Sequence, residues 1–137
     1  MTESKNCVFC KIVANEIPSY RVWEDQNFVA FLNINPVVAG HLLIIPKGHI
    51  DSVFELPEEL YHGLFDTGKL LAEPLKLATD CKRVGLSVVG LDVAHAHLHL
   101  MPMNASGDAD HAKARSAGIE ELTKMQELIK QAIIKHI

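Results

Sequence analysis

The chain has 137 residues, 48% of them hydrophobic and 22% charged, which is typical of a soluble globular protein long enough to bury one core. Its formal net charge of −4 argues against nonspecific binding to nucleic acid but allows a nucleotide ligand, which needs only local donors. No apolar run approaches the roughly 20 residues that span a bilayer, and residues 1–6 are too polar for a signal peptide. We therefore expect a single domain, residues 1–137, in the cytoplasm.

Near the start of the chain, Cys7 and Cys10 are separated by two residues, a spacing that is common in zinc sites. The chain has three cysteines, which form no even set of disulfides, and a reducing compartment favours metal binding by the pair over a bridge. A tetrahedral zinc site needs two further ligands, for which His49 and His95 are candidates. Two buried or redox-active thiols are the alternative interpretation.

Runs of apolar and β-branched residues predict five strands, at 20–24, 28–32, 42–45, 86–89 and 94–101. The first two form a hairpin, and the short link at 90–93 makes the last two antiparallel neighbours. Amphipathic helices are predicted at about 57–79, where Pro74 should kink or weaken the last turns, and at 114–136. The small polar residues 104–112 predict a mobile loop. The pattern indicates an α+β fold in which two main helices pack on a five-stranded, mainly antiparallel sheet.

Three histidines, His95, His97 and His99, occupy every second position within the last predicted strand. Successive side chains of a strand point to opposite faces, so these imidazoles should line one face, about 7 Å apart, with the apolar residues between them on the other. A strand whose polar face merely happens to be rich in histidine is the alternative. Because imidazole titrates near neutral pH, the pattern favours metal binding, proton transfer or nucleophilic catalysis, which the three histidines alone do not separate.

If His95 faces a metal, His97 and His99 remain for a second task. A neutral imidazole with one free ring nitrogen is a nucleophile toward phosphorus, so His97 could attack an α-phosphate and form a covalent phosphoramidate that water then cleaves. His99 could donate to the phosphate oxygens and offset the charge of the transition state. His41, at the start of a central strand, could approach this site or be structural. We assign no role to His62, His111, His136 and Cys81.

These residues resemble the histidine-triad (HIT) family, whose signature is His-φ-His-φ-His-φ-φ with φ an apolar residue. Residues 95–101, with the sequence His-Ala-His-Leu-His-Leu-Met, fit this signature at every position. The resemblance covers about residues 7–103 and extends, in the order of the family, to residues 7–12, 16–18, 30–36 and 40–49. It implies the HIT fold, a homodimer whose sheets join into one continuous sheet, and binding of nucleoside phosphates, usually purine nucleotides.

The resemblance also implies an enzyme, a nucleotidyl hydrolase or transferase with a nucleotidyl intermediate on the middle histidine, His97. Its substrate would be a nucleoside phosphoramidate, an adenylated adduct or a dinucleoside polyphosphate, attacked at the α-phosphorus. In zinc-containing members the ligands correspond to Cys7, Cys10, His49 and His95, and we expect a structural zinc ion. A purine-nucleotide-binding regulatory protein with little turnover is the second interpretation, and a zinc-stabilised interaction protein is the third.

In the family, the nucleobase pocket corresponds to residues near Phe9, Ile12, Phe31, Leu32 and Ile34. Asn33 stands where many members hold the ribose hydroxyls with an acid, and an amide can still bond there. Three other positions depart from the family pattern. Leu91 replaces a glutamine and cannot hydrogen-bond a phosphate or bridging oxygen, and Met103 replaces an arginine. Asp92 stands where a hydroxyl residue is common and should repel phosphate unless it is turned away or protonated.

Overall fold

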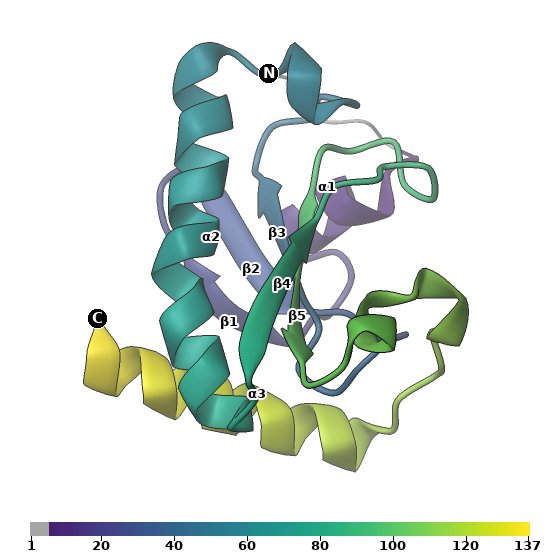
Figure 1. The fold of residues 1–137 in the computed structure, drawn as a ribbon. Helices are drawn as coiled ribbons and strands as arrows, with labels where there is room; N and C mark the ends of the chain where they lie inside the picture. The colour runs from purple at the N-terminus through teal and green to yellow at the C-terminus, as the bar shows by residue number, and fades with distance from the viewer. Residues whose placement is uncertain (1–5) are drawn as a thin grey trace.

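Residues 6–137 are described by a computed structural model, in which a five-stranded antiparallel sheet packs against two long helices (Figure 1). The predicted α+β fold is confirmed. Residues 1–5, part of the segment in which we expect no signal peptide, lie outside the described residues. Within residues 6–137, no helix has the length and apolar character needed to cross a membrane. The elements in chain order are α1 (Val8–Val13), β1 (Arg21–Glu24), β2 (Phe28–Leu32), β3 (Leu42–Pro46), η1 (Val53–Glu55), α2 (Glu58–Thr79), β4 (Arg83–Ser87), β5 (Leu98–Met103), η2 (Ser106–Ala109), η3 (His111–Lys113) and α3 (Ile119–His136).

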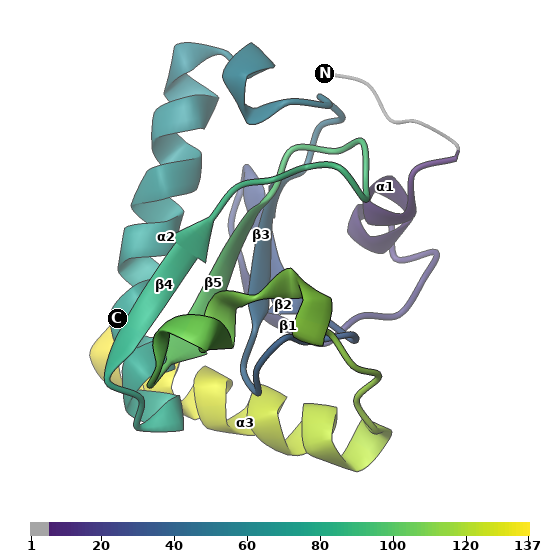
Figure 2. The ribbon, with the colours of Figure 1, turned by 45° about the vertical axis from the view of Figure 1, so that its right-hand side comes forward.

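The sheet has the strand order β1-β2-β3-β5-β4, and every neighbouring pair is antiparallel. All side chains of the central strands β2 and β3 are buried, because both faces of this part of the sheet are covered. Ala30 and Ile44 belong to the core under α2 and α3, whereas Phe31 and Leu43 belong to the core under α1. Figure 2 shows α2 and α1 on opposite sides of the sheet.

The larger core lies between the sheet and the two long helices. It contains Leu64, Leu71 and Leu75 from α2 together with Leu122 and Ile129 from α3, all of them buried. A fully buried leucine contributes about 2 kcal/mol relative to an exposed one, so this face supplies most of the apolar burial that orders the sheet. The helix α1 has only six residues and covers part of the opposite face. The rest of that face is available for a ligand site.

The two edges of the sheet differ in how they are covered. On the β1 edge, the Arg21 carbonyl accepts a hydrogen bond from Gln126 Nε2 of α3 at 2.8 Å. On the other edge, no strand of the described residues pairs with the outer side of β4, and Leu86 is 46% exposed there. An uncovered edge strand is a template for pairing with another chain, and β4 is the edge that is open in this way.

The boundaries of the last two strands differ from the prediction. The strand β4 begins three residues before the predicted range 86–89, and β5 begins four residues after the start of the range 94–101. The Ala96 N–H donates to the Ile50 carbonyl at 2.6 Å, so the chain before β5 pairs with the segment after β3 and not with β4. The prediction could not include this contact, because it joins residues far apart in the sequence.

The boundaries of the helix α2 were predicted more closely than those of the last two strands, and those of α3 less closely at its start. The helix α2 matches the range 57–79 and continues through Pro74 as one helix. The helix α3 begins five residues after the start of the range 114–136, because the Ala117 N–H donates to the Ile34 carbonyl at 3.1 Å and holds the chain extended. The predicted loop 104–112 contains η2 and the start of η3.

Candidate functional site

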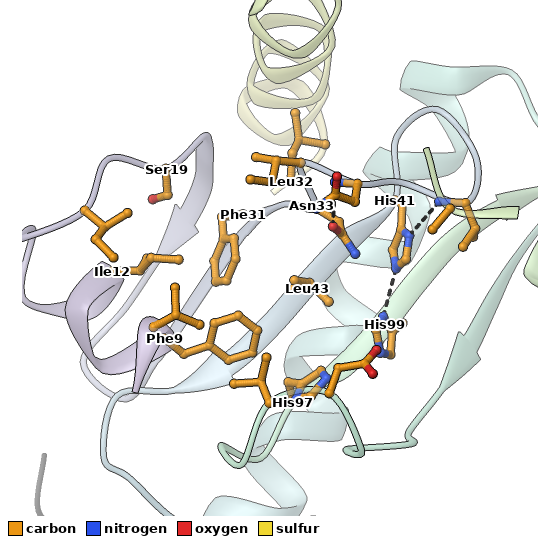
Figure 3. Close-up of a pocket in the computed structure, with 18 of the residues that line it drawn as sticks. Phe9, Ile12, Ser19, Phe31, Leu32, Asn33, His41, Leu43, His97 and His99 are labelled. Atoms are coloured by element: carbon orange, nitrogen blue, oxygen red, sulfur yellow. Dashed lines mark hydrogen bonds between the residues drawn. The ribbon is translucent and has the colours of Figure 1, made fainter. Parts of the chain in front are cut away.

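The candidate site is a cavity of about 380 Å³ on the face of the sheet that α1 partly covers. In Figure 3, His41 and His99 lie at one end of this cavity and Ile12 lies at the other, with Phe9 and His97 side by side between them. The lining includes every residue that we predicted for nucleotide binding and for catalysis, namely Phe9, Ile12, Phe31, Leu32, Asn33, Ile34, His41, His97 and His99. The structure thus brings one polar end and one apolar end together in a single cavity.

A second group, which we call the metal-ligand set, consists of Cys7, Cys10, His49 and His95. Its four candidate ligand atoms, two sulfurs and two ring nitrogens, all lie within 4.8 Å of one another. His95 Nδ1 lies 3.3 Å from Cys7 Sγ and 3.6 Å from Cys10 Sγ, and His49 Nδ1 lies 3.4 Å from Cys10 Sγ. Zinc bonds of about 2.3 Å to sulfur and 2.0 Å to nitrogen place tetrahedral sulfur and nitrogen ligands about 3.5 Å apart. The donor set therefore fits Zn²⁺.

Backbone carbonyls assign opposite roles to the ring nitrogens of His95 and His97. His95 Nε2 lies 2.9 Å from the Pro46 carbonyl oxygen, which can only accept, so Nε2 carries the proton and Nδ1 is left for a metal. His97 Nδ1 lies 2.7 Å from the His95 carbonyl oxygen, so here Nδ1 carries the proton and Nε2 keeps its lone pair. Of these two histidines, His97 lines the cavity and His95 does not. The unprotonated Nε2 of His97 is therefore the nitrogen available to a ligand in the cavity.

Burial determines the charge of both imidazoles. It lowers the pKa of His97, and the hydrogen bond to the His95 carbonyl and the nearby charge of Asp92 oppose part of that effect. Burial also lowers the pKa of His95, against an opposing contribution from its hydrogen bond to Pro46. Both side chains are therefore neutral near pH 7, the form in which an imidazole nitrogen can bind a metal or attack phosphorus.

His41 orients His99 through a chain of hydrogen bonds (Figure 3). The Val37 N–H donates to His41 Nδ1 at 3.2 Å, so the proton of His41 is on Nε2. His41 Nε2 donates to His99 Nδ1 at 2.8 Å, which leaves the proton of His99 on Nε2 as a donor. Burial, with smaller effects of neighbouring histidines, lowers the pKa of His41 to about 4 and that of His99 to about 3. At neutral pH both are uncharged hydrogen-bonding groups.

Phe9 lies between the two histidine groups. Its ring centroid is 5.8 Å from that of His95 and 5.2 Å from that of His97, in both cases edge to face. It also meets Phe31 edge to face at 5.6 Å. These apolar ring surfaces suit a flat aromatic base. Asn33 Oδ1 accepts from the Asn35 N–H at 2.8 Å, so its amide nitrogen is left as a donor, and Asn33 lies beside His41 in Figure 3.

His111 was assigned no role from the sequence, yet it lines the cavity. Its ring centroid lies 4.8 Å from that of His99 and 6.1 Å from that of His41, and its Nε2 lies 3.3 Å from Ser87 Oγ. The element η3 returns the chain to the site after β5 has ended. No motif connects His111 to the three-histidine pattern, so only the fold identifies it.

The three departures from the family pattern occupy different environments. Asp92 lines the cavity. Leu91 is 89% exposed and is absent from the lining, and Met103 packs over Gly85 on β4. The ring centroids of His97 and His99 are 5.0 Å apart, closer than the expected 7 Å, and His97 precedes the first residue of β5.

Residues 14–106 match the family model of the HIT domain. The chain belongs to the histidine-triad (HIT) family. It is 38% identical over 112 residues to Protein hit of Bacillus subtilis, a match that covers 77% of this chain and 76% of that protein. It is 38% identical over 97 residues to adenosine 5'-monophosphoramidase HNT1 of Saccharomyces cerevisiae, with 70% of this chain and 61% of that protein covered.

The fold of this HIT chain also matches solved structures of the family. The crystal structure of a Zn-bound histidine triad family protein from Mycobacterium smegmatis aligns with a TM-score of 0.83 at 27% identity, covering 95% of this chain and 94% of that one. The family resemblance inferred from the sequence is thus confirmed. The relatives of this HIT protein include a phosphoramidase and a protein whose structure contains zinc.

Proposed function

We propose that this HIT protein hydrolyses or transfers the nucleotidyl group at the α-phosphorus of a purine nucleoside phosphate. The candidate substrates are a phosphoramidate, an adenylated adduct and a dinucleoside polyphosphate. The observation that carries the proposal is the hydrogen bond from His97 Nδ1 to the His95 carbonyl, which leaves the Nε2 lone pair of a cavity histidine available. The named activity of the yeast relative, a phosphoramidase, agrees with this chemistry.

In the proposed reaction, His97 Nε2 attacks the phosphorus and forms a P–N bond while the bond to the leaving group breaks and its electron pair departs with that group. Water then attacks the phosphorus and loses a proton, the P–N bond to His97 breaks, and the electron pair returns to Nε2. A nucleoside monophosphate is released. If another nucleophile replaces water, the same intermediate gives transfer.

The other cavity residues bind and orient the substrate in this proposal. His99 Nε2–H donates to the phosphate oxygens, and His41 keeps that proton on Nε2 by donating to the opposite nitrogen. The apolar end, which includes Phe9, Ile12, Phe31, Leu32 and Ile34, takes the base. The amide nitrogen of Asn33 donates to a ribose oxygen.

We further propose that the metal-ligand set holds a structural Zn²⁺. Four protein ligands complete a tetrahedral shell, so the ion contributes folding stability and offers no open position to a substrate. The exposed β4 edge, with Leu86 on the strand, Val89 just after it and Leu70 and Leu77 on the adjacent α2, supports a homodimer in which two sheets join. Exposed apolar residues beside an uncovered edge strand are typical of such an interface.

A brief mixing experiment tests the proposed reaction. The protein is mixed with adenosine 5'-phosphoramidate, quenched, and weighed intact to detect a covalent nucleotidyl adduct, while released AMP is measured in parallel. We expect His97→Ala to lose the adduct and at least about 1,000-fold in AMP release, because the nucleophile is removed. His62→Ala, an exposed histidine on α2, is the matched control.

Two outcomes would contradict the proposal. Activity retained by His97→Ala would exclude this residue as the nucleophile. Tight AMP binding by the unaltered protein without any turnover would instead support a regulatory nucleotide-binding protein. The exposure of Leu91, which leaves no hydrogen-bonding side chain at that position of the connection, is the observation that favours this second function.

A further inference from the structure

The charges around the cavity are unusual for a site that binds phosphate. Within the part of the chain that the structure describes, neither lysine nor arginine lines the cavity, and Asp92 is its only carboxylate. The proposed phosphate donor His99 and its partner His41 are neutral at pH 7, since burial lowers their pKa values to about 3 and about 4. A phosphoryl group is therefore met by neutral donors and one carboxylate.

The basic residues nearest in sequence to His111 are Lys113 and Arg115. Arg115 Nη2 lies 2.7 Å from Glu121 Oε2. Neither Lys113 nor Arg115 belongs to the cavity lining. A single negative charge on the α-phosphate is compatible with this environment, but a chain of several phosphates is not matched by any cation of the lining.

Asp92 lies on the phosphate side of the cavity. It belongs to the connection between β4 and β5, three residues before the buried His95, and its charge acts on the His97 imidazole. The base end is closed by the rings of Phe9 and Phe31. The part of a substrate beyond the α-phosphorus therefore extends toward the end that Asp92 and His111 line. Asp92 is also exposed, so its carboxylate can meet a solvated group there.

We propose that Asp92 selects the leaving group by its charge, favouring a leaving amine that carries a positive charge and disfavouring a polyphosphate. The proposal rests on the function proposed above and specifies its substrate. As the P–N bond of a phosphoramidate breaks, its electron pair leaves with the nitrogen, which takes a proton from solvent and departs as an amine. A carboxylate stabilises positive charge on that departing group and repels the additional negative charges of a polyphosphate.

Three substrates separate charge from shape. Adenosine 5'-N-(2-aminoethyl)phosphoramidate has a cationic leaving group, the N-propyl analogue has a neutral group of nearly equal size, and diadenosine tetraphosphate has an anionic one. We expect kcat/KM of the unaltered protein to favour the aminoethyl over the propyl substrate by about tenfold at low salt. Asp92→Asn should abolish this preference, leave the propyl substrate within about twofold, and raise turnover of the tetraphosphate about tenfold.

Two controls make the test specific to the charge of Asp92. Asp66→Asn removes an exposed carboxylate from α2, on the opposite face of the sheet, and should change none of the three values. The assays are repeated with His111→Asn, so that this neighbouring imidazole does not enter the comparison. In the unaltered protein, the preference should also decrease as the salt concentration rises, which tests the proposal without any substitution.

The outcomes distinguish this inference from the function on which it rests. If the unaltered protein cleaves none of the three substrates, the proposed function fails and the inference fails with it. If it cleaves the phosphoramidates but Asp92→Asn keeps the aminoethyl preference, the inference is overturned while the proposed function stands. A preference that is lost in Asp92→Asn, kept in Asp66→Asn and weakened by salt supports it.

Discussion

His95 of the metal-ligand set and His97 of the cavity belong to one three-histidine motif, yet they present opposite ring nitrogens. His95 donates through Nε2 to the Pro46 carbonyl and is left with Nδ1, whereas His97 donates through Nδ1 to the His95 carbonyl and is left with Nε2. The same residue type, at the same spacing, thus becomes suited to a metal in one case and to phosphorus in the other. The difference shows that the carbonyl within reach, and not the residue type, determines which chemistry an imidazole can perform.

Removing the sulfur ligands should have the largest effect. We expect Cys7→Ser combined with Cys10→Ser to abolish zinc binding and to lower the free energy of unfolding by at least about 3 kcal/mol, because metal-binding energy contributes directly to folding. Elemental analysis and denaturant unfolding measure the two effects. Cys81→Ser is the matched control, since the Cys81 thiol donates a hydrogen bond to the Arg83 carbonyl at 3.3 Å and does not belong to the metal-ligand set. An unchanged unfolding curve for the double variant would show that the metal-ligand set does not contribute to the free energy of unfolding.

On the cavity side, His41→Asn should lower kcat by about 10- to 100-fold with less change in nucleotide affinity. Asparagine cannot reproduce the hydrogen bonds to Val37 and His99 together, so His99 loses the partner that keeps its proton on Nε2. Steady-state kinetics with a phosphoramidate, together with calorimetry of AMP binding, separates the two quantities. Full activity in His41→Asn would show that His99 needs no orienting partner.

The smallest effect concerns pH. Burial lowers the pKa of His41 from its usual 6.5 to about 4 in the folded protein, so the unfolded chain binds more protons in acid. The stability that comes from neutral His41 is therefore complete above about pH 6.5 and decreases as the pH falls toward 4. We expect the free energy of unfolding of His41→Asn to fall less steeply over this window, by roughly 1 kcal/mol per pH unit.

Urea unfolding at several pH values measures this slope, and His62→Asn, an exposed histidine on α2, should keep the slope of the unaltered protein. Each variant is compared with the unaltered protein under the same metal conditions, so the acid sensitivity of the metal-ligand set cancels. Equal slopes for His41→Asn and the unaltered protein would mean that burial of this imidazole does not contribute to acid sensitivity.

The regularity of the motif made one part of the site predictable. Alternation with period two placed Leu98 and Leu100 in the core under the long helices and His97 and His99 on the cavity side, and any strand-like backbone has this property. The metal-ligand set followed from ligand chemistry together with the family resemblance. The predicted α+β fold followed from the strand and helix periodicities, which are local properties of the sequence.

Contacts between distant residues were not predictable in the same way. The pairing of Ala96 with Ile50 shortens the last strand, and the return of η3 brings His111 beside His99. Neither contact leaves a periodic pattern in the sequence. The environments of Leu91 and Asp92 also differ, one turned to solvent and the other lining the cavity, because the connection that carries them follows no regular pleat.

The short helix α1 carries Cys10 of the metal-ligand set and, within the same six residues, Phe9 and Ile12 of the cavity. A metal ion and a purine nucleotide would therefore restrain one common rigid element from two sides. Thermodynamic linkage is reciprocal, so whatever factor the metal adds to nucleotide affinity, the nucleotide must add to metal affinity. The occupancy of the cavity and that of the proposed zinc site would then be one coupled equilibrium, with α1 as the element that they share.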